Sequence, residues 1–296
     1  MKTTLCLLAL ITAMPTMAQE NAPGVAPPPQ AEQTQQVDLM KMTRDPRCGQ
    51  VLVTCLVGGE PLRMLLDTGA THTVLHTESA AKLKQARWLD TSQMMFRGNA
   101  KQTPKILVTS LQAGGTAAPE FPFMVLPLDA VRQALVEPID GILGMDVLGG
   151  LAFTFDLRKN EYYWGLPSSG VLEQLYGKQD RFGRLVMQVK CTGKELNLLL
   201  DTGSSITRVR EEDWRPGSAG NISAQMGDVN EAARIQVKEG KPADIEVAKG
   251  IVLKGIAPIF GLDGQPPVLG MDALKNQVLI HLPLEDNPYG VFLMQK

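Results

Sequence analysis

The sequence predicts a mostly β protein built from two related lobes. The stretch "MLLDTGATHTVL" at residues 64–75 is repeated as "LLLDTGSSITRV" at 198–209, and "GILGMDVL" at 141–148 is repeated as "PVLGMDAL" at 267–274. Short apolar runs separated by Gly, Pro and Asn surround both pairs, which is typical of strands and turns. Two motifs repeated in the same order indicate a duplicated domain rather than a solenoid.

The N-terminal residues predict export. Residues 1–18 have a basic start at Lys2, an apolar run too short to span a bilayer and a small-residue site, so we expect a signal peptide cleaved after Ala18. The mature protein is then secreted or periplasmic, with no membrane span. A net charge of -2 argues against a nucleic-acid or anionic-membrane partner.

A Pro- and Gln-rich segment follows at residues 19–44. Its few large apolar residues cannot bury enough surface to fold, so we predict a flexible leader. A propeptide that covers the functional site is the alternative interpretation.

The two lobes are predicted at residues 45–166 and 167–296. Residues 49–67 and 183–201 each show a strand, a Gly-containing turn and a second strand, which is a hairpin pattern. The two copies of Asp-Thr-Gly lie 134 positions apart, and the two copies of Leu-Gly-Met-Asp lie 126 positions apart. The second lobe therefore lacks eight residues between its two motifs. Helical periodicity is confined to residues 78–89 and 129–137.

The repeated Asp-Thr-Gly suggests a specific chemistry. An Asp at the end of an apolar strand emerges at the edge of a core, and the Gly after Thr permits a tight turn. Two such turns meeting at a pseudo-twofold axis place two carboxylates side by side. Such a pair holds one proton, so one member can accept a proton from water while the other polarises a carbonyl.

These motifs resemble the retropepsin and pepsin-type aspartic proteases, and "DTGATHTVL…GILGMDVL" is similar to bacterial retropepsin-like domains. The resemblance covers residues 45–296 and implies two β-barrel lobes with an active-site cleft between them. It assigns the catalytic dyad to Asp67 and Asp201, and interlocking hydrogen bonds beneath the dyad to Thr68 and Thr202. It places in the supporting active-site loops Thr68, Gly69, Ala70, Thr202, Gly203, Ser204, Gly144 and Gly270.

The two copies differ directly after the Asp-Thr-Gly. A hydroxyl at Ser204 could donate to the neighbouring carboxylate, whereas Ala70 cannot. We therefore expect Asp201 to ionise more readily and Asp67 to hold the proton. Residues 96–104 and 226–232 are the candidate tips of hairpins that cover the cleft.

Other reactive residues receive structural interpretations. His72, His76 and His281 lack the pattern of a zinc site, so no metal and no cofactor is expected. Asp146 and Asp272 are read as helix caps. Cys48, Cys55 and Cys191 are read as small buried residues, with a pairing to Cys191 left open.

The sequence thus predicts an exported aspartic endopeptidase, active as a monomer, that binds a protein or peptide substrate in extended form. Processing of envelope proteins and degradation of host or dietary proteins both remain open as its role. The alternative is a catalytically silent peptide-binding or envelope-assembly module on the same fold.

Overall fold

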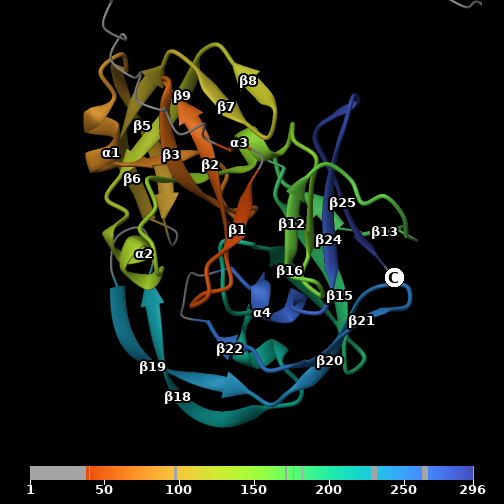
Figure 1. Ribbon diagram of the computed structural model, residues 1–296. Coiled ribbons are helices and arrows are strands. Elements are labelled where there is room, and N and C mark those ends of the chain that lie inside the picture. The colour runs from red at the N-terminus through yellow and green to blue at the C-terminus, as the bar shows by residue number, and fades with distance from the viewer. Residues whose placement is uncertain are drawn as a thin grey trace, which may run out of the picture. The chain divides into compact units, whose positions relative to one another are not determined.

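Two sheets with the same strand order make up most of the fold (Figure 1). The computed structural model describes residues 38–39, 41–96, 99–170, 172–175, 177–181, 183–227, 232–261 and 266–295. The predicted signal peptide and most of the predicted leader lie outside these residues.

The first sheet runs in the order β5-β6-β9-β4-β10-β3-β2-β7-β8, with β1 paired to β2. Its strands are β1 (Met42–Arg44), β2 (Val51–Val57), β3 (Glu60–Leu66), β4 (Val74–His76), β5 (Arg87–Phe96), β6 (Asn99–Val108), β7 (Leu111–Ala113), β8 (Thr116–Ala118), β9 (Phe121–Leu126) and β10 (Gly141–Leu143).

The second sheet repeats this order strand for strand, as β18-β19-β22-β17-β23-β16-β15-β20-β21, with β14 paired to β15. Its strands are β14 (Gly177–Gln179), β15 (Leu185–Cys191), β16 (Lys194–Leu200), β17 (Arg208–Val209), β18 (Ser218–Gly227), β19 (Ala232–Gly240), β20 (Ala243–Ala248), β21 (Ile251–Ile256), β22 (Ile259–Phe260) and β23 (Val268–Leu269). The fold is therefore mostly β with two retropepsin-like lobes, as the sequence predicted.

A third sheet joins the two copies. It has the order β12-β11-β24-β25-β13 and consists of β11 (Phe153–Asp156), β12 (Glu161–Trp164), β13 (Leu172–Gln174), β24 (Val278–Leu284) and β25 (Asn287–Gln295). Thr154 of β11 pairs with Ile280 of β24, its counterpart at the 126-residue offset. The pseudo-twofold axis therefore passes between these two residues. The predicted lobe boundary at 166/167 falls between β12 and β13 and stays a prediction.

The hairpins predicted at 49–67 and 183–201 form because turn chemistry and strand alternation agree. Gly58 and Gly59 both have positive φ, at 58° and 86°, which suits a two-residue hairpin turn. The equivalent turn of the second copy uses Thr192 at φ 47° and Gly193 at 74°. The strands that follow, β3 and β16, end in buried leucines directly before the two Asp-Thr-Gly turns.

The helices are short: α1 (Thr77–Lys82), α2 (Asp129–Ala134), α3 (Met145–Leu148), α4 (Met271–Leu274) and a 3-10 turn at Glu211–Asp213. The helix predicted at 78–89 was wrong in its second half, because β5 begins at Arg87. The predicted helix at 129–137 is present in shorter form as α2. No helix in the described part of the chain is long and apolar enough to cross a bilayer.

The connection that contains helix α2 accounts for most of the difference in length between the copies. In the first lobe, residues 127–140 connect β9 to β10 and contain α2, whereas in the second only residues 261–267 connect β22 to β23. The first-lobe connection covers a separate apolar cluster of Leu52, Leu65, Val74, Met124, Leu126, Leu128, Leu135, Ile139 and Ile142. The hairpin β18–β19 of the second lobe contacts α2, so the helix also bridges the lobes (Figure 1).

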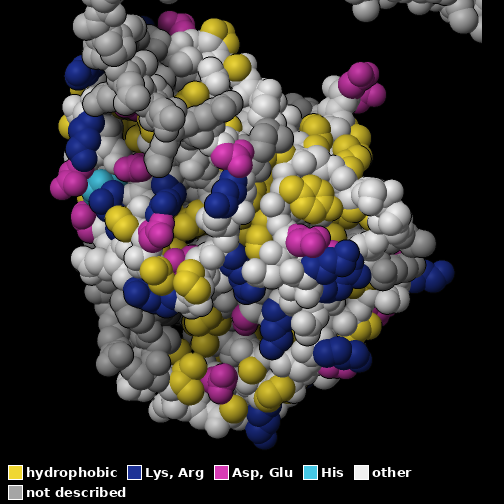
Figure 2. All heavy atoms as spheres, in the orientation of Figure 1, with side chains coloured by type: hydrophobic (Ala, Val, Ile, Leu, Met, Phe, Trp, Pro, Cys, Tyr) yellow, Lys and Arg dark blue, Asp and Glu magenta, His cyan; other side chains and the backbone are white. Residues whose placement is uncertain are grey.

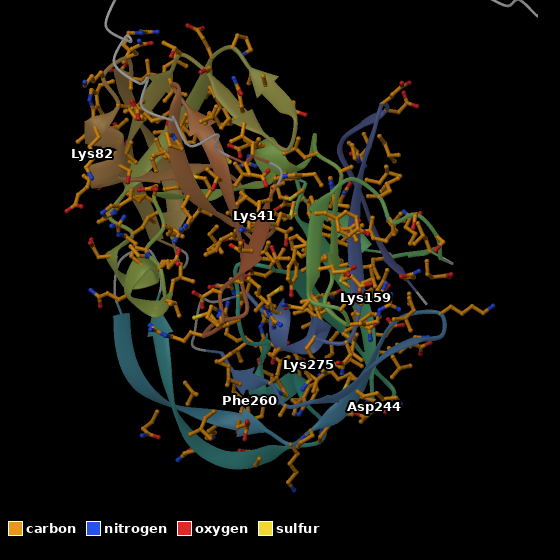
Figure 3. The ribbon with its side chains drawn as sticks, viewed as in Figure 1. Lys41, Lys82, Lys159, Asp244, Phe260 and Lys275 are labelled. Atoms are coloured by element: carbon orange, nitrogen blue, oxygen red, sulfur yellow. The ribbon has the colours of Figure 1, made fainter. Side chains whose placement is uncertain are left out.

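The main core runs through both lobes and the third sheet. Phe153 and Phe155 are fully buried, and Phe260 of β22, labelled in Figure 3, belongs to the same cluster. Met42 of β1 is also buried, and β1 pairs with β2 through Thr43 and Leu52. The ordered strands therefore begin inside the segment 19–44 that the sequence predicts as flexible, because Met42 adds apolar area to the sheet.

Charged side chains of both signs are interspersed on the visible face of the molecule (Figure 2). This distribution agrees with the small net charge and gives that face no extended basic surface.

Replacing Phe153 by Ala should lower the free energy of unfolding by about 3–5 kcal/mol, because the side chain is fully buried between Phe155 and His281 with ring centroids 5.1 Å away in both cases. Denaturant unfolding at fixed pH measures the change. Leu166→Ala is the matched control, since Leu166 is 47% exposed. Equal effects of the two substitutions would contradict the assignment of Phe153 to the core.

Candidate active site

Asp67 and Asp201 stand at the same position in their lobes, directly after β3 and β16. The backbone N–H of Asp67 donates to Leu143 of β10, and that of Asp201 donates to Leu269 of β23, each at 3.1 Å. Both strands end in three buried residues, and Asp67 and Asp201 are half-buried residues at the strand end. The parallel partner strand therefore fixes where each Asp-Thr-Gly turn begins.

The two carboxyl groups meet and share a hydrogen bond. Oδ1 of Asp67 accepts the N–H groups of Gly69 at 2.8 Å and Ala70 at 3.0 Å. Oδ1 of Asp201 accepts the N–H of Ser204 at 3.0 Å. Each turn therefore folds back on its own carboxylate and aims it at the other lobe.

Glycine is required in both turns because the opposite carboxylate fills the space of a side chain. A β-carbon on Gly69 would lie 2.5 Å from Cγ of Asp201, and one on Gly203 would collide with the carboxyl of Asp67. Any side chain at either position would push the two carboxylates apart.

Thr68 and Thr202 join the turns beneath the carboxylates. The hydroxyl of Thr68 donates to the Leu200 carbonyl at 2.9 Å and accepts the N–H of Thr202 at 3.1 Å. The hydroxyl of Thr202 donates to the Leu66 carbonyl at 2.9 Å and accepts the N–H of Thr68 at 3.0 Å. Both threonines are buried. These are the reciprocal bonds that the family resemblance implied.

Gly144 and Gly270 pack behind the turns. A β-carbon on Gly144 would lie 2.7 Å from the His72 carbonyl carbon, and one on Gly270 would lie 2.6 Å from that of Ile206. Their N–H groups donate to the hydroxyls of Thr73 and Thr207 at 3.0 and 3.1 Å.

Asp146 and Asp272 are not N-cap residues as the sequence suggested, although Asp272 accepts the N–H of Ala273 in the first turn of α4 at 2.8 Å. Asp146 accepts the Thr73 hydroxyl at 2.7 Å and the Thr73 N–H at 2.9 Å. Asp272 accepts the same two groups of Thr207, at 2.7 and 2.8 Å. The N-cap positions of α3 and α4 are Gly144 and Gly270, which make no side-chain cap bond. The carboxylates therefore tie α3 and α4 to the residues directly before β4 and β17, and burial raises the pKa of each.

Ser204 acts on Asp201 through its backbone. Its hydroxyl donates to the Ile206 carbonyl at 2.8 Å, so the expected bond from this hydroxyl to the carboxylate is not the one that forms. Ala70 packs against the apolar cluster beneath α2. The difference between the two residues does not explain an unequal titration of the pair.

Burial and mutual repulsion instead govern the two carboxyls. Burial, followed by the negative charge of Asp201, raises the pKa of Asp67 to about 8. Burial also raises the pKa of Asp201, but the positive charge of Arg208 opposes that rise. The expectation that Asp67 holds the shared proton stays a prediction. Arg208, whose counterpart 134 positions earlier is Val74, is a charged group that acts on Asp201 and has no equivalent in the first lobe.

The histidines and cysteines occupy structural positions. Nδ1 of buried His76 accepts the Leu128 N–H at 3.0 Å, and buried His281 bonds the Leu151 carbonyl at 2.7 Å. Cys55 and Cys191 are buried and free, and Cys48 is free and half-buried. In the described ranges, no group of three or more His, Cys, Asp or Glu is placed to hold a metal ion.

Each lobe has a hairpin at the residues that the sequence suggests as tips of hairpins covering the cleft, 96–104 and 226–232. β5 pairs with β6, and β18 pairs with β19. Residues 97–98 and 228–231, at the two tips, lie outside the described residues. β5 and β18 each end the strand order of their sheet, so each has one neighbour in that order.

Thr68→Val should lower the free energy of unfolding by about 2–3 kcal/mol, because it leaves the buried Leu200 carbonyl and Thr202 N–H without their partner. Thr68→Ser keeps the hydroxyl and should cost clearly less. Denaturant unfolding of the two variants tests this, and a Ser variant as unstable as the Val variant would show that the methyl group, not the hydroxyl, matters.

The half of the site that lies in the first lobe falls within a segment that matches a known family. A sequence comparison with individually curated proteins gave no match. Residues 53–147 match the family model described as aspartyl protease. That segment begins within β2 and ends within α3, so it contains Asp67, Thr68, Gly69, Ala70 and Gly144. Over the segment that carries one Asp-Thr-Gly turn and its supporting loop, the chain is similar to the aspartyl proteases.

Proposed function

We propose that the chain is an aspartic endopeptidase whose catalytic dyad is Asp67 and Asp201. The observation that carries this proposal is the meeting of the two carboxyls in a shared hydrogen bond, each held by the N–H groups of its own turn. The family match over residues 53–147 supports a protease. The equivalence of the second sheet to the first extends the same chemistry to the second turn.

The mechanism divides the work between the two carboxyls. Asp201, with Arg208 favouring its charged form, takes a proton from a water held between the carboxyls. The resulting hydroxide attacks the peptide carbonyl carbon while protonated Asp67 donates its hydrogen bond to the carbonyl oxygen. Collapse of the tetrahedral intermediate breaks the C–N bond, and the amine leaves with a proton from the dyad.

The substrate is an extended peptide. β5 and β18 end their sheets and belong to the two hairpins, so a strand-like peptide can pair with their backbones by strand addition.

Both half-sites lie in one chain, so the active form is a monomer. The signal-peptide pattern of residues 1–18 makes it an exported enzyme, secreted or periplasmic.

Asp67→Asn and Asp201→Asn should each lower kcat/KM for an unfolded protein substrate at least about 1,000-fold, because each removes one of the two proton-transfer roles. Asp244→Asn is the matched control, since Asp244 is exposed and paired with Lys254. Mass spectrometry of the cleaved fragments, with and without a pepstatin-type inhibitor, measures the loss. Cleavage that persists in either active-site variant would refute the dyad mechanism. An intact, folded protein that binds the peptide without cleaving it would identify a binding module.

Activity should follow a bell-shaped pH profile. As pH falls, Asp201 becomes protonated and can no longer accept a proton from water. As pH rises through about 8, Asp67 loses the proton that its raised pKa retains, and the carbonyl is no longer polarised. Measurement of kcat/KM from pH 3 to pH 9 tests this. Activity that keeps rising between pH 8 and pH 9 would contradict the assignment of Asp67 as the proton holder.

A further inference from the structure

We propose that Gln50 and Arg184 are positioning residues that hold each Asp-Thr-Gly turn from the opposite lobe and strengthen its hydrogen bond to the dyad. The inference rests on the proposed function only in its effect on catalysis. Its effect on the titration of Asp67 and Asp201 can be measured whether or not the protein cleaves peptides.

The two residues occupy one position in the duplicated fold. Gln50 directly precedes β2 and Arg184 directly precedes β15, and they lie 134 positions apart, as the two Asp-Thr-Gly turns do. Nε2 of Gln50 donates to the carbonyl of Gly203. Nη1 of Arg184 donates to the carbonyl of Gly69 at 3.3 Å. Each bond therefore runs from the start of one lobe to the functional turn of the other.

Each contacted carbonyl belongs to the peptide group that binds an aspartate. The Gly69 carbonyl shares its peptide with the N–H of Ala70, which donates to Asp67 at 3.0 Å. The Gly203 carbonyl shares its peptide with the N–H of Ser204, which donates to Asp201 at 3.0 Å. A donor on the carbonyl oxygen polarises the peptide and makes its N–H a stronger donor. Arg184 thereby acts on Asp67, and Gln50 acts on Asp201, through one peptide group.

The two positions differ in charge. Gln50 is neutral and buried, whereas Arg184 is cationic and about one-third exposed. Nε of Arg184 donates to Asp180 at 2.7 Å, which fixes the guanidinium and leaves Nη1 for Gly69. The other charged residues that line the same cavity as Arg184 are Glu195, Arg210 and Asp213. Since a charged donor polarises a peptide more strongly than an amide does, the turn of Asp67 receives the stronger support.

The test replaces the two donors and follows the dyad directly. Arg184→Met and Gln50→Leu remove the donor at similar side-chain length, and Lys254→Met removes an exposed, ion-paired lysine as the matched control. Carbon NMR of the aspartate carboxyls in substrate-free protein gives the two apparent pKa values of the pair. Hydrogen bonds to a carboxylate favour its ionised form, so losing one raises its pKa.

Arg184→Met should raise the upper apparent pKa by about half a unit or more, and Gln50→Leu should raise the lower one by a smaller amount. With an active wild type, kcat should fall about tenfold in Arg184→Met, KM should change less than about twofold, and the alkaline limb should move to higher pH. Arg184→Lys, which keeps a charged donor, should recover part of the lost kcat. Lys254→Met should leave all these values unchanged.

A variant that fails to fold is replaced by Arg184→Gln, which puts into the second lobe the residue that the first lobe already uses. It should shift the upper pKa in the same direction by less than Arg184→Met. Unchanged apparent pKa values in folded Arg184 and Gln50 variants would overturn the inference. An inactive wild type with shifted pKa values in the variants would instead refute the proposed function and leave the positioning role standing.

Discussion

Two carboxyl groups that repel one another are held together at the junction of two lobes, and the surrounding structure is arranged around that constraint. The reciprocal bonds of Thr68 and Thr202 lock the two turns beneath the carboxyls, where both side chains are buried. Gly69 and Gly203 allow the approach because neither leaves a side chain in the way. The N–H groups of the turns stabilise negative charge, whereas burial opposes it, so the pair retains a proton over a wide range of pH.

Much of this arrangement could be predicted from the repeated motifs. The duplication, the hairpins and the pairing of Asp67 with Asp201 follow from apolar strands that end in Asp-Thr-Gly at matching positions. The influence of Arg208 could not be predicted, because its position beside Asp201 depends on the packing of β17 rather than on a motif. Gln50 and Arg184 were missed for a related reason. Gln50 and Arg184 are different residue types at equivalent positions, so a comparison of the two copies shows no shared residue there. Both nevertheless donate to a glycine carbonyl.

The two lobes share one strand order but differ in the segments that pack over their sheets. Helix α2 closes an apolar face in the first lobe and contacts the hairpin β18–β19 of the second. The described residues of the shorter connection between β22 and β23 form no equivalent helix. A cationic Arg208 in place of Val74 favours the charged form of Asp201, whereas a cationic Arg184 in place of Gln50 contacts the turn of Asp67. A nearly symmetric backbone thus surrounds the two aspartates with different charged groups.

The five-stranded sheet has a consequence for how the molecule is made. β11 pairs with β24, whose residues follow it by more than 120 positions, so this sheet closes only after nearly all of the second lobe has been synthesised. Domains fold in order as a chain emerges, and β11 lacks its partner strand until then, although both Asp-Thr-Gly turns have already been made. The order of synthesis thus places the joining of the two lobes by this sheet at the end of folding.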